Sequence, residues 1–262
     1  MFTIHDEKVL IAGDWHGVLF QGKQAIQKAV NEGITTIFHV GDFGVYPSYE
    51  KYLKGLNWTA KKSGITIYFV DGNHENFEYL YRYPLNEDGT RTLRSNIIHL
   101  PRGLVFKWGE HDVLALGGAY SVDKNMRTDR RDWFIEEWVT PEELALSIEN
   151  SKGKDIKLML MHDSPASCPN PVTDEIRSQL RGISLFGKEN IDKSALHRRN
   201  LDAVFHAVKP TFLVHGHYHS RFTRRTEYGH VIGLHEGNYG TDANCIVFTQ
   251  EYLSNPESIY QF

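Results

Sequence analysis

The residues best suited to chemistry in this chain are aspartates, asparagines and histidines, which fall in short clusters far apart in the sequence. The clusters are Asp-Trp-His at 14–16, Gly-Asp at 41–42, Gly-Asn-His-Glu at 72–75, His-Asp at 162–163 and His-Gly-His-Tyr-His at 215–219. Imidazole and carboxylate groups without thiolates suit Zn, Fe, Mn or Co ions rather than a structural thiolate site. The residue types therefore indicate a transition-metal site.

The candidate ligands are too numerous for one tetrahedral ion. They suit two ions about 3.5–4 Å apart that share a bridging carboxylate. Such a pair polarises a phosphoryl oxygen, acidifies a bridging water and holds the attacking and leaving oxygens in line. The residues alone thus predict a dinuclear site suited to phosphate-ester hydrolysis.

Each cluster directly follows a predicted β-strand. Apolar, β-branched segments predict these strands at 9–12, 34–40, 65–70, 157–161 and 211–214. Helical patterns at 21–31 and 48–62 separate the first three strands, which predicts a parallel sheet covered by helices. In open α/β sheets ligands bind outside the carboxyl ends of the strands, so we expect the five clusters to converge.

The rest of the chain has a different pattern. Segments 96–100, 104–108 and 112–116 predict short antiparallel strands, and residues 117–139 predict a long functional loop. A helix is expected to begin after Thr140, which has the N-cap, proline and glutamate signals. Further expectations are a Pro-rich loop to about Pro171, a helix at 194–208 and closing antiparallel strands at 221–226, 230–234 and 244–249. With no linker composition or internal repeat, residues 1–262 are predicted to form a single domain.

Each cluster also has an ordinary structural interpretation when taken alone. Asp14 and His16 suit a capped turn, Asp42 after glycine is common turn chemistry, and His162 suits a hydrogen-bonded histidine at a strand edge. The occurrence of all five clusters at strand ends, in one order, favours a shared site.

Bulk composition excludes several classes of protein. The net charge of -4 gives no electrostatic footprint for nucleic acid, and no apolar run has the ~18 residues of a membrane helix. Two cysteines are too few for a disulfide framework, and the acidic N-terminus does not resemble a signal peptide. We therefore expect a cytoplasmic protein with neither a membrane nor a stable nucleic-acid partner.

The order of motifs resembles the calcineurin-like metallophosphoesterases. Asp-x-His, Gly-Asp, Gly-Asn-His-Glu, a lone His and Gly-His-x-His match that family's signature over residues 10–219. The resemblance implies an α/β fold, a four-layer α-β-β-α sandwich with mixed sheets and the metals at the carboxyl ends of the strands. It also implies the roles of individual residues. Asp14, His16 and His219 would hold the first metal, Asp42 would bridge, Asn73, His162 and His217 would complete the second, and His74 would protonate the leaving oxygen.

One departure from the family's pattern concerns the subfamily. Protein Ser/Thr phosphatases carry Gly-Asp-x-x-Asp-Arg-Gly at the second motif, whereas this chain reads Gly-Asp-Phe-Gly-Val-Tyr-Pro. Val45 stands where the acidic partner of the catalytic histidine would be, and no arginine follows. The departure argues against protein phosphatase activity, and the overall pattern looks more like small bacterial or phage-type phosphodiesterases.

The loop at 117–139 is the best candidate for substrate contact. Guanidinium groups pair with phosphate, and an indole can stack on a base or ring. The candidate contacts are Arg127, Arg130, Arg131 and Trp133, with Glu136 and Glu137 beside them. The alternative is a solvated surface loop with one buried tryptophan.

The sequence therefore predicts a phosphodiesterase in which a metal-bridging hydroxide attacks phosphorus in line. The expected cofactors are two divalent transition metal ions, with Mn favoured and Fe, Zn or Co as alternatives. The expected substrate is a small phosphate ester, with cyclic nucleotides as one candidate. Diesters are preferred because no arginine pair stands beside the metal motifs to hold a dianion. The alternatives are a phosphomonoesterase or protein phosphatase of the same superfamily, or a non-catalytic scaffold.

Overall fold

A computed structural model describes residues 2–168 and 180–260 of the chain. The β-strands are β1 (Thr3–Ile4), β2 (Lys8–Ala12), β3 (Thr36–Val40), β4 (Thr66–Val70), β5 (Arg91–Arg94), β6 (Ile97–His99), β7 (Leu104–Trp108), β8 (His111–Leu116), β9 (Ile156–Met161), β10 (Phe212–His215), β11 (Phe222–Thr226), β12 (Gly229–Gly233) and β13 (Cys245–Thr249). The helices are α1 (Leu19–Asn31), α2 (Glu50–Lys62), α3 (Phe77–Leu80), α4 (Pro141–Ser151), α6 (Leu180–Phe186), α7 (Lys188–Val208), α8 (Thr241–Asn244) and α9 (Gln250–Ser254).

The strands form two mixed sheets. One has the order β1-β7-β8-β9-β10-β12-β11, and the other has the order β13-β2-β3-β4-β6-β5. Within them β2, β3 and β4 are parallel neighbours, and so are β8, β9 and β10. These two parallel triplets bring their carboxyl ends to the same end of the molecule, which is where the motif loops begin.

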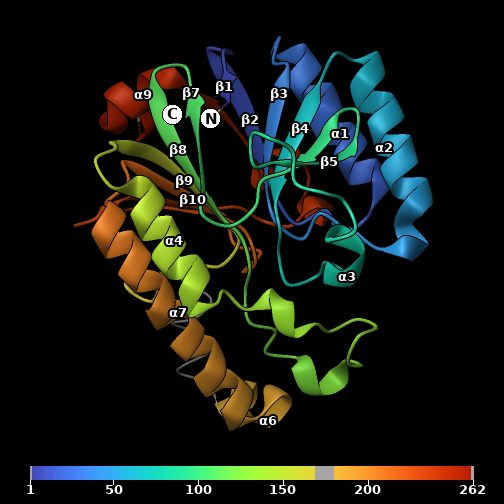
Figure 1. The fold of residues 1–262 in the computed structure, drawn as a ribbon, viewed down its shortest axis with the longest axis vertical. Helices are drawn as coiled ribbons and strands as arrows, with labels where there is room; N and C mark the ends of the chain where they lie inside the picture. The colour runs from blue at the N-terminus through green and yellow to red at the C-terminus, as the bar shows by residue number, and fades with distance from the viewer. Residues whose placement is uncertain (1, 169–179, 261–262) are drawn as a thin grey trace.

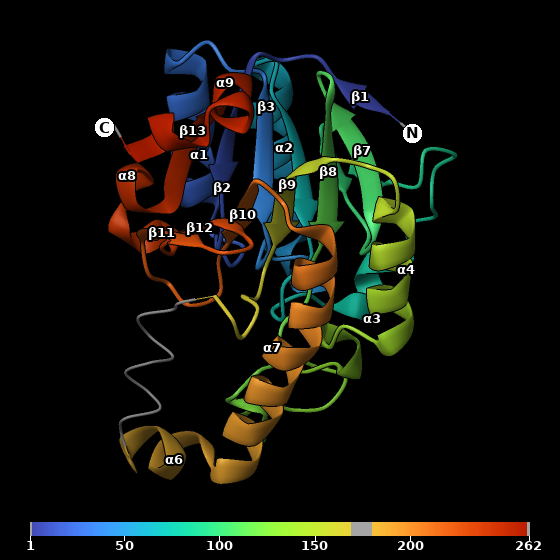
Figure 2. The same cartoon turned by 90° about the vertical axis from the view of Figure 1, so that its left-hand side faces the viewer.

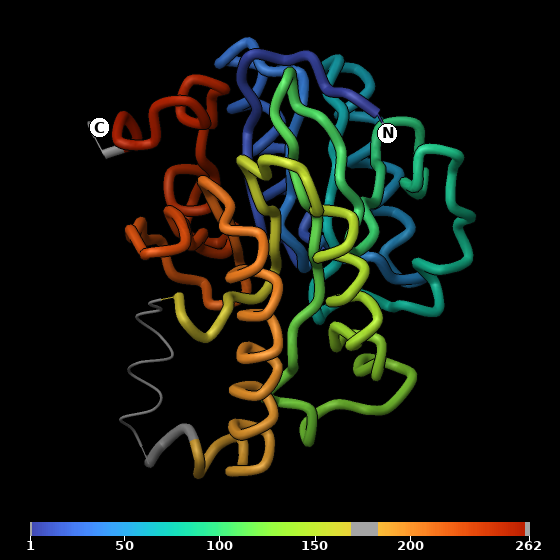
Figure 3. The backbone as a smooth tube through the Cα atoms, turned by 60° about the vertical axis from the view of Figure 1, so that its left-hand side comes forward, coloured from blue at the N-terminus to red at the C-terminus, as the bar shows by residue number. Residues whose placement is uncertain are grey.

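The alternation of side chains along the central strands explains the layers. Val9 and Ile11 of β2 point into a core between the sheets, whereas Leu10 and Ala12 belong to the core beneath α1 and α2. On the other sheet Leu114 packs in the core beneath α4 and α7. Figure 1 shows these helix pairs on opposite sides of the strands, so the layers run α-β-β-α. In Figure 3, α4 and α7 run side by side over their sheet.

The structure confirms the strands that precede the five motifs, each within two residues of its predicted bounds. It also confirms the start of α4, where Thr140 and Glu143 form a reciprocal capping box. The fold class implied by the resemblance, a four-layer α/β sandwich with mixed sheets, is present. The predicted Pro-rich loop ends outside the described residues.

Two predictions of detail were wrong and one was incomplete. The strand near 96–100 pairs parallel with β4, and its antiparallel partner β5 was not expected. The antiparallel pairing expected for the strand at 230–234 is present between β12 and β11, but β12 also pairs parallel with β10. The helix expected at 194–208 begins at Lys188, because its first turns are polar and held by exposed ion pairs such as Lys188–Asp192, which leave no apolar periodicity to detect.

The loop at 117–139 contains two short 3-10 turns, Lys124–Met126 and Ile135–Glu137. Figure 2 shows α7 extending past the strand ends toward α6, on the same side as this loop. Among the described helices none is both long and apolar enough to cross a membrane.

Candidate metal centre and substrate site

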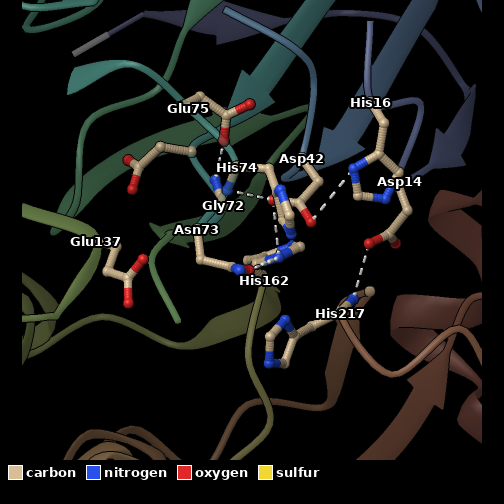
Figure 4. A network of polar contacts seen from close by, with 12 residues as sticks. Asp14, His16, Asp42, Gly72, Asn73, His74, Glu75, Glu137, His162 and His217 are labelled. Atoms are coloured by element: carbon tan, nitrogen blue, oxygen red, sulfur yellow. Dashed lines mark hydrogen bonds and ion pairs between the residues drawn. The ribbon is translucent and has the colours of Figure 1, made fainter. Parts of the chain in front are cut away.

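The predicted metal ligands come together from both sheets. Asp14 and His16 follow β2, Asp42 follows β3 and Asn73 follows β4, all from one sheet. His162 follows β9, while His217 and His219 follow β10 of the other sheet. Figure 4 shows Asp14, His16, Asp42, Asn73 and His162 grouped around a common centre, with His217 beside them.

Short distances join the clustered side chains into one group. Ligand atoms of Asp14, His16 and His219 all lie within 4.8 Å of one another, and the same holds for Asp14, Asp42 and His162. His16, Asp42 and His74 form a third such group. Because Asp14 and Asp42 each belong to two groups, the clusters adjoin, as expected of a site for more than one ion.

Backbone strain is concentrated at these same residues. Among the described non-glycine residues, seven have a positive φ, and five of the seven are predicted ligands. These five are Asp14, His16, Asp42, His217 and His219, with φ between 47° and 65°. Left-handed conformations of such residues cost about 1–3 kcal/mol each and persist at sites where the surrounding structure enforces them. The strain is an independent sign that the loops serve a ligand.

Asp42 lies at the middle of the site. Its Oδ1 accepts the backbone N–H of His74 at 2.8 Å and lies 3.3 Å from Nε2 of His162, while Oδ2 lies 3.8 Å from Nδ1 of His16. Burial alone would raise the pKa of Asp42, but His162 and His74 hold it well below its usual value. The carboxylate is therefore ionised at neutral pH, as a bridging ligand must be.

His162 is oriented by a backbone acceptor. Its Nδ1 donates to the carbonyl of Val40 at 2.8 Å, which directs Nε2 toward Asp42 and toward Oδ1 of Asn73, 3.1 Å away. Burial would lower the pKa of His162, but the Asp42 carboxylate raises it to about 10. Since a metal ligand must be unprotonated, a metal ion at His162 would displace this proton.

Asp14 offers a direct test of fit to a cation. It is fully buried, and its Oδ2 has no hydrogen-bond partner among the described residues. Oδ1 accepts from the backbone N–H of His217 at 3.0 Å and lies 3.5 Å from Nε2 of His219. A buried carboxylate oxygen without a partner is costly unless a cation binds it. The donor set therefore fits divalent metal ions.

Glycines allow the strand ends to approach one another. A Cβ at Gly72 would overlap the Asp42 carboxylate, and a Cβ at Gly41, where φ is +92°, would overlap the His162 ring. Glu75 joins the same two loops, because its carboxylate accepts the backbone N–H groups of Gly44 and Gly72. Glu75 therefore supports the two ligand loops from behind.

Asn73 is held by a buried chain of hydrogen bonds. Its Nδ2 donates to Oγ of Ser121 at 2.9 Å, and Ser121 Oγ donates to Oε2 of Glu137 at 2.7 Å. Glu137 Oε1 accepts from the Ser121 N–H at 2.8 Å and from Nε1 of Trp133 at 3.0 Å. Because the Asn73 amide nitrogen is engaged in this way, its oxygen faces His162 and the site.

A second support joins the loops after β9 and β10. Asp163, beside His162, accepts from Nδ1 of His197 at 2.8 Å and from the Tyr218 hydroxyl at 2.6 Å. His197 belongs to α7 and Tyr218 lies between the two predicted ligands of its loop. Asp163 therefore ties both ligand loops to the helix that covers this sheet.

The loop at 117–139 places an arginine on the candidate acid. Nη2 of Arg127 lies 2.6 Å from Nε2 of His74, and the Arg127 guanidinium also pairs with Asp123 at 2.9 Å. Because guanidinium can only donate, Nε2 of His74 accepts and the proton of the neutral ring is on Nδ1. Burial, opposed by the charge of Asp42 and assisted by that of Arg127, lowers the pKa of His74 to about 4.

The other candidate substrate contacts divide into two groups. Arg131 is largely exposed and lines a cavity of about 380 Å³ next to the metal ligands, together with Arg127. Trp133 is 7% exposed, with its indole bonded to Glu137 and Lys124 over its ring, so it supports the loop instead of offering a stacking surface. Arg130 pairs with Glu136 at 2.7 Å and does not line that cavity.

A buried ion pair anchors this loop to β4. Asp71 accepts from Nε and Nη2 of Arg102 at 2.9 and 2.6 Å, and Arg102 in turn donates to the carbonyls of Glu136 and Trp138. Asp71 thus acts at a distance from the ligands, by fixing the segment that carries Glu137.

Sequence reasoning missed several residues that the structure places around the site. Ser121, Asp123 and Glu236 had no motif to mark them, although Glu236 Oε2 lies 3.7 Å from Nδ1 of His219. Ser121 lies in the loop after β8, separated from the strand by residues 117–120, so the loop after a sixth strand also contributes a polar residue. That position after a strand was the one signal available in the sequence.

Comparison with known proteins agrees with this geometry. The family model of the calcineurin-like phosphoesterases matches residues 7–221. The chain belongs to this family of metal-dependent phosphate-ester hydrolases. No curated protein sequence matches the chain.

A solved structure shows the same fold at low sequence identity, and two others are similar to the chain with lower scores. The protein TT1561 of Thermus thermophilus is 11% identical, with a TM-score of 0.54 over 93% of this chain and 98% of that one. A dimetal phosphatase from Danio rerio is 12% identical, with a TM-score of 0.49 over 88% and 87% of the two chains. An archaeal phosphodiesterase is 14% identical, with a TM-score of 0.39 over 92% and 99%. The last two structures resemble this chain only loosely.

Proposed function

We propose that this protein is a phosphodiesterase that requires two divalent metal ions, with Mn as the favoured metal. The observation that carries the proposal is the convergence of Asp14, Asp42 and their neighbouring imidazoles on one buried centre, with strained backbone at five of the seven predicted ligands. The first ion would be held by Asp14, His16 and His219, and the second by Asn73, His162 and His217, with Asp42 between them.

When bound, the two ions would supply an activated water and neutralise charge on the phosphoryl group. The chain's own residues supply the geometry. The buried, ionised Asp42 and Asp14 attract the cations, while the Val40 carbonyl and the Ser121 hydroxyl fix the orientations of His162 and Asn73.

His74 is proposed to protonate the leaving oxygen. With a pKa of about 4 it is neutral at pH 7 in the free protein. An anionic substrate beside the ring raises that pKa, because the opposite charge favours imidazolium. Protonation of His74 is thus coupled to substrate binding, and Arg127 is placed to donate hydrogen bonds to the same phosphate.

The preference for diesters rests on the charges around the phosphate position. One guanidinium, that of Arg127, lies beside His74, which the sequence did not predict. Its partner Asp123 already compensates its charge, so the pair is better matched to the single negative charge of a diester than to a dianion. The sequence favoured diesters because no arginine pair stands beside the metal motifs to hold a dianion. Because Arg127 does lie beside His74, a phosphomonoesterase is the second candidate function.

The proposal is tested by comparing bis-p-nitrophenyl phosphate with p-nitrophenyl phosphate, in Mn²⁺ and after chelation, for the wild type and Asn73→Ala. We expect faster turnover of the diester, lost with chelator and reduced at least about a hundredfold in the variant. Faster turnover of the monoester would establish the second candidate. No turnover of either ester by protein that holds its metals would support a non-catalytic scaffold instead.

A further inference from the structure

A cavity of about 380 Å³ opens beside His74 and Arg127, with the predicted ligand His16 also in its wall. It is lined by the two tyrosines Tyr46 and Tyr49, by Ser48, and by Arg127 and Arg131 of the long loop. A smaller cavity of about 210 Å³ is lined by Asp42, Asn73, His217 and His219. His74 and Arg127 line both cavities, so they form the wall where the two meet.

The smaller cavity lies over the predicted metal ligands and is where a phosphate would bind. Since His74 must touch the leaving oxygen to protonate it, a leaving group bonded to that oxygen passes His74 into the larger cavity. The larger cavity is thus placed to receive the leaving arm of a diester. Its volume falls in the range of small-molecule pockets, about 300–1,000 Å³.

The walls of the larger cavity suit a planar ring. Tyr46 and Tyr49 have ring centroids 5.4 Å apart, and Tyr49 packs so closely on Gly17 that a Cβ there would overlap its ring. Tyr49 remains partly exposed at 40% and so presents a held aromatic surface to the cavity. Aromatic rings and guanidinium planes are the surfaces on which bases stack.

The charges argue against a second phosphate in this cavity. Arg131 pairs with Asp132 at 3.1 Å, and Arg127 pairs with Asp123 at 2.9 Å. Both guanidinium charges are therefore compensated by neighbouring carboxylates. An arm carrying further phosphates would need uncompensated positive charge, whereas an uncharged ring needs none.

From these contacts we infer that the substrate is a phosphodiester whose leaving arm carries an uncharged planar ring, of the nucleoside or aryl class, bound between Tyr49 and the arginines of the long loop. This inference rests on the proposed function and names the substrate class of the same site.

The test uses two diesters that share a retained methyl group and differ in the leaving arm: methyl p-nitrophenyl phosphate and methyl trifluoroethyl phosphate. Both are assayed by phosphorus NMR with the Mn²⁺-loaded protein. Tyr49→Ala is expected to lower kcat/KM for the aryl ester about tenfold, mainly through KM, and to change the alkyl ester by less than about twofold. Tyr49→Phe, which keeps the ring, should retain the wild-type preference.

Two further variants test whether the effect of Tyr49→Ala is specific to the cavity. Arg131→Ala, which changes another residue that lines the cavity, should also reduce turnover of the aryl ester selectively. Trp58→Ala removes an exposed aromatic on α2 outside the cavity and should change neither ester. Equal losses on both esters in Tyr49→Ala, or no loss on either, would overturn the inference while metal-dependent turnover by the wild type kept the proposed function. No metal-dependent turnover by the wild type would overturn both.

Discussion

At the scale of single residues, the site depends on side chains that are placed at a cost. Asp14 and Asp42 are buried carboxylates on left-handed backbone, and one Asp14 oxygen has no hydrogen-bond partner among the described residues. Burial and strain both oppose folding, so something that binds the folded state must offset them. The divalent ions of the proposed centre would do so, which would explain why these loops keep a geometry that the chain alone disfavours.

Glu137 acts on the metal site through Ser121. Glu137→Gln would replace an acceptor oxygen with an amide donor, so one of its hydrogen bonds with Ser121 or Trp133 would be lost. The Asn73 amide would then be free to rotate. We expect the affinity for metal to fall about 10–100-fold, the usual effect of disturbing groups behind a ligand. Titration with Mn²⁺ measures it.

The matched control is Glu136→Gln, whose carboxylate pairs with the exposed Arg130. An unchanged metal affinity in Glu137→Gln, or the same loss in both variants, would contradict the positioning role.

Burial is the main reason that the pKa of His74 is low, and the charge of Arg127 adds to the effect. Its positive charge lowers the pKa of the imidazole, so removing it in Arg127→Met should raise that pKa. If His74 is the acid, as proposed, turnover of the trifluoroethyl ester needs its protonated form and falls as pH rises through its pKa. The falling limb of the pH profile should therefore move to higher pH in the variant, whatever happens to the maximum rate.

The comparison for this profile is Arg131→Met, whose guanidinium pairs with Asp132 instead of His74. A falling limb that stayed in place, or moved to lower pH, in Arg127→Met would count against the coupling between Arg127 and the proposed acid.

At the scale of elements, the strands bring ligands together and the loop at 117–139 completes the site. The loop buries Tyr120 and Phe134, and it is also held by Arg102, which joins Asp71 to the carbonyls of Glu136 and Trp138. Ordering this loop gives the site Ser121, Glu137 and Arg127 together. The buried pair of Asp71 and Arg102 thus helps to position Ser121, Glu137 and Arg127, which it does not contact through their side chains.

Arg102→Met would leave the buried Asp71 carboxylate with the imidazole of His99 as its remaining side-chain partner. Breaking a buried pair in this way costs about 3–5 kcal/mol of unfolding free energy. Urea unfolding should show this loss, and the loop's contribution to turnover should fall with it. Thr140→Ala, which removes the N-cap of α4, should cost about 1 kcal/mol and leave turnover near wild type. A loss below about 1 kcal/mol in Arg102→Met would show that the loop is held otherwise.

Element type and ligand position could be predicted from the sequence because both are local. An apolar run such as residues 65–70 and the Gly-Asn-His-Glu that follows it are close neighbours in the chain, so strand and motif are found together. The contact between Arg127 and His74 joins residues 53 apart through a polar loop without periodicity, and no pattern marks it. The burial of Trp133 is equally hidden, since an indole suits both a core and a stacking surface.

At the scale of the whole molecule, the sandwich explains why two sheets are needed. Each sheet has four adjacent parallel strands whose carboxyl ends lie at the same end of the molecule. Facing the sheets against a shared core places the two sets of loops opposite one another. A single sheet would spread the same ligands along a line. We propose that the chain works as one catalytic domain, because the proposed centre takes ligands from both sheets.

The most direct test of the central claim is the number of metal ions bound per chain after reconstitution with Mn²⁺, measured by elemental analysis of the purified protein. A dinuclear centre predicts about two ions per chain. Well under one ion per chain would contradict the proposed metal centre and the function built on it.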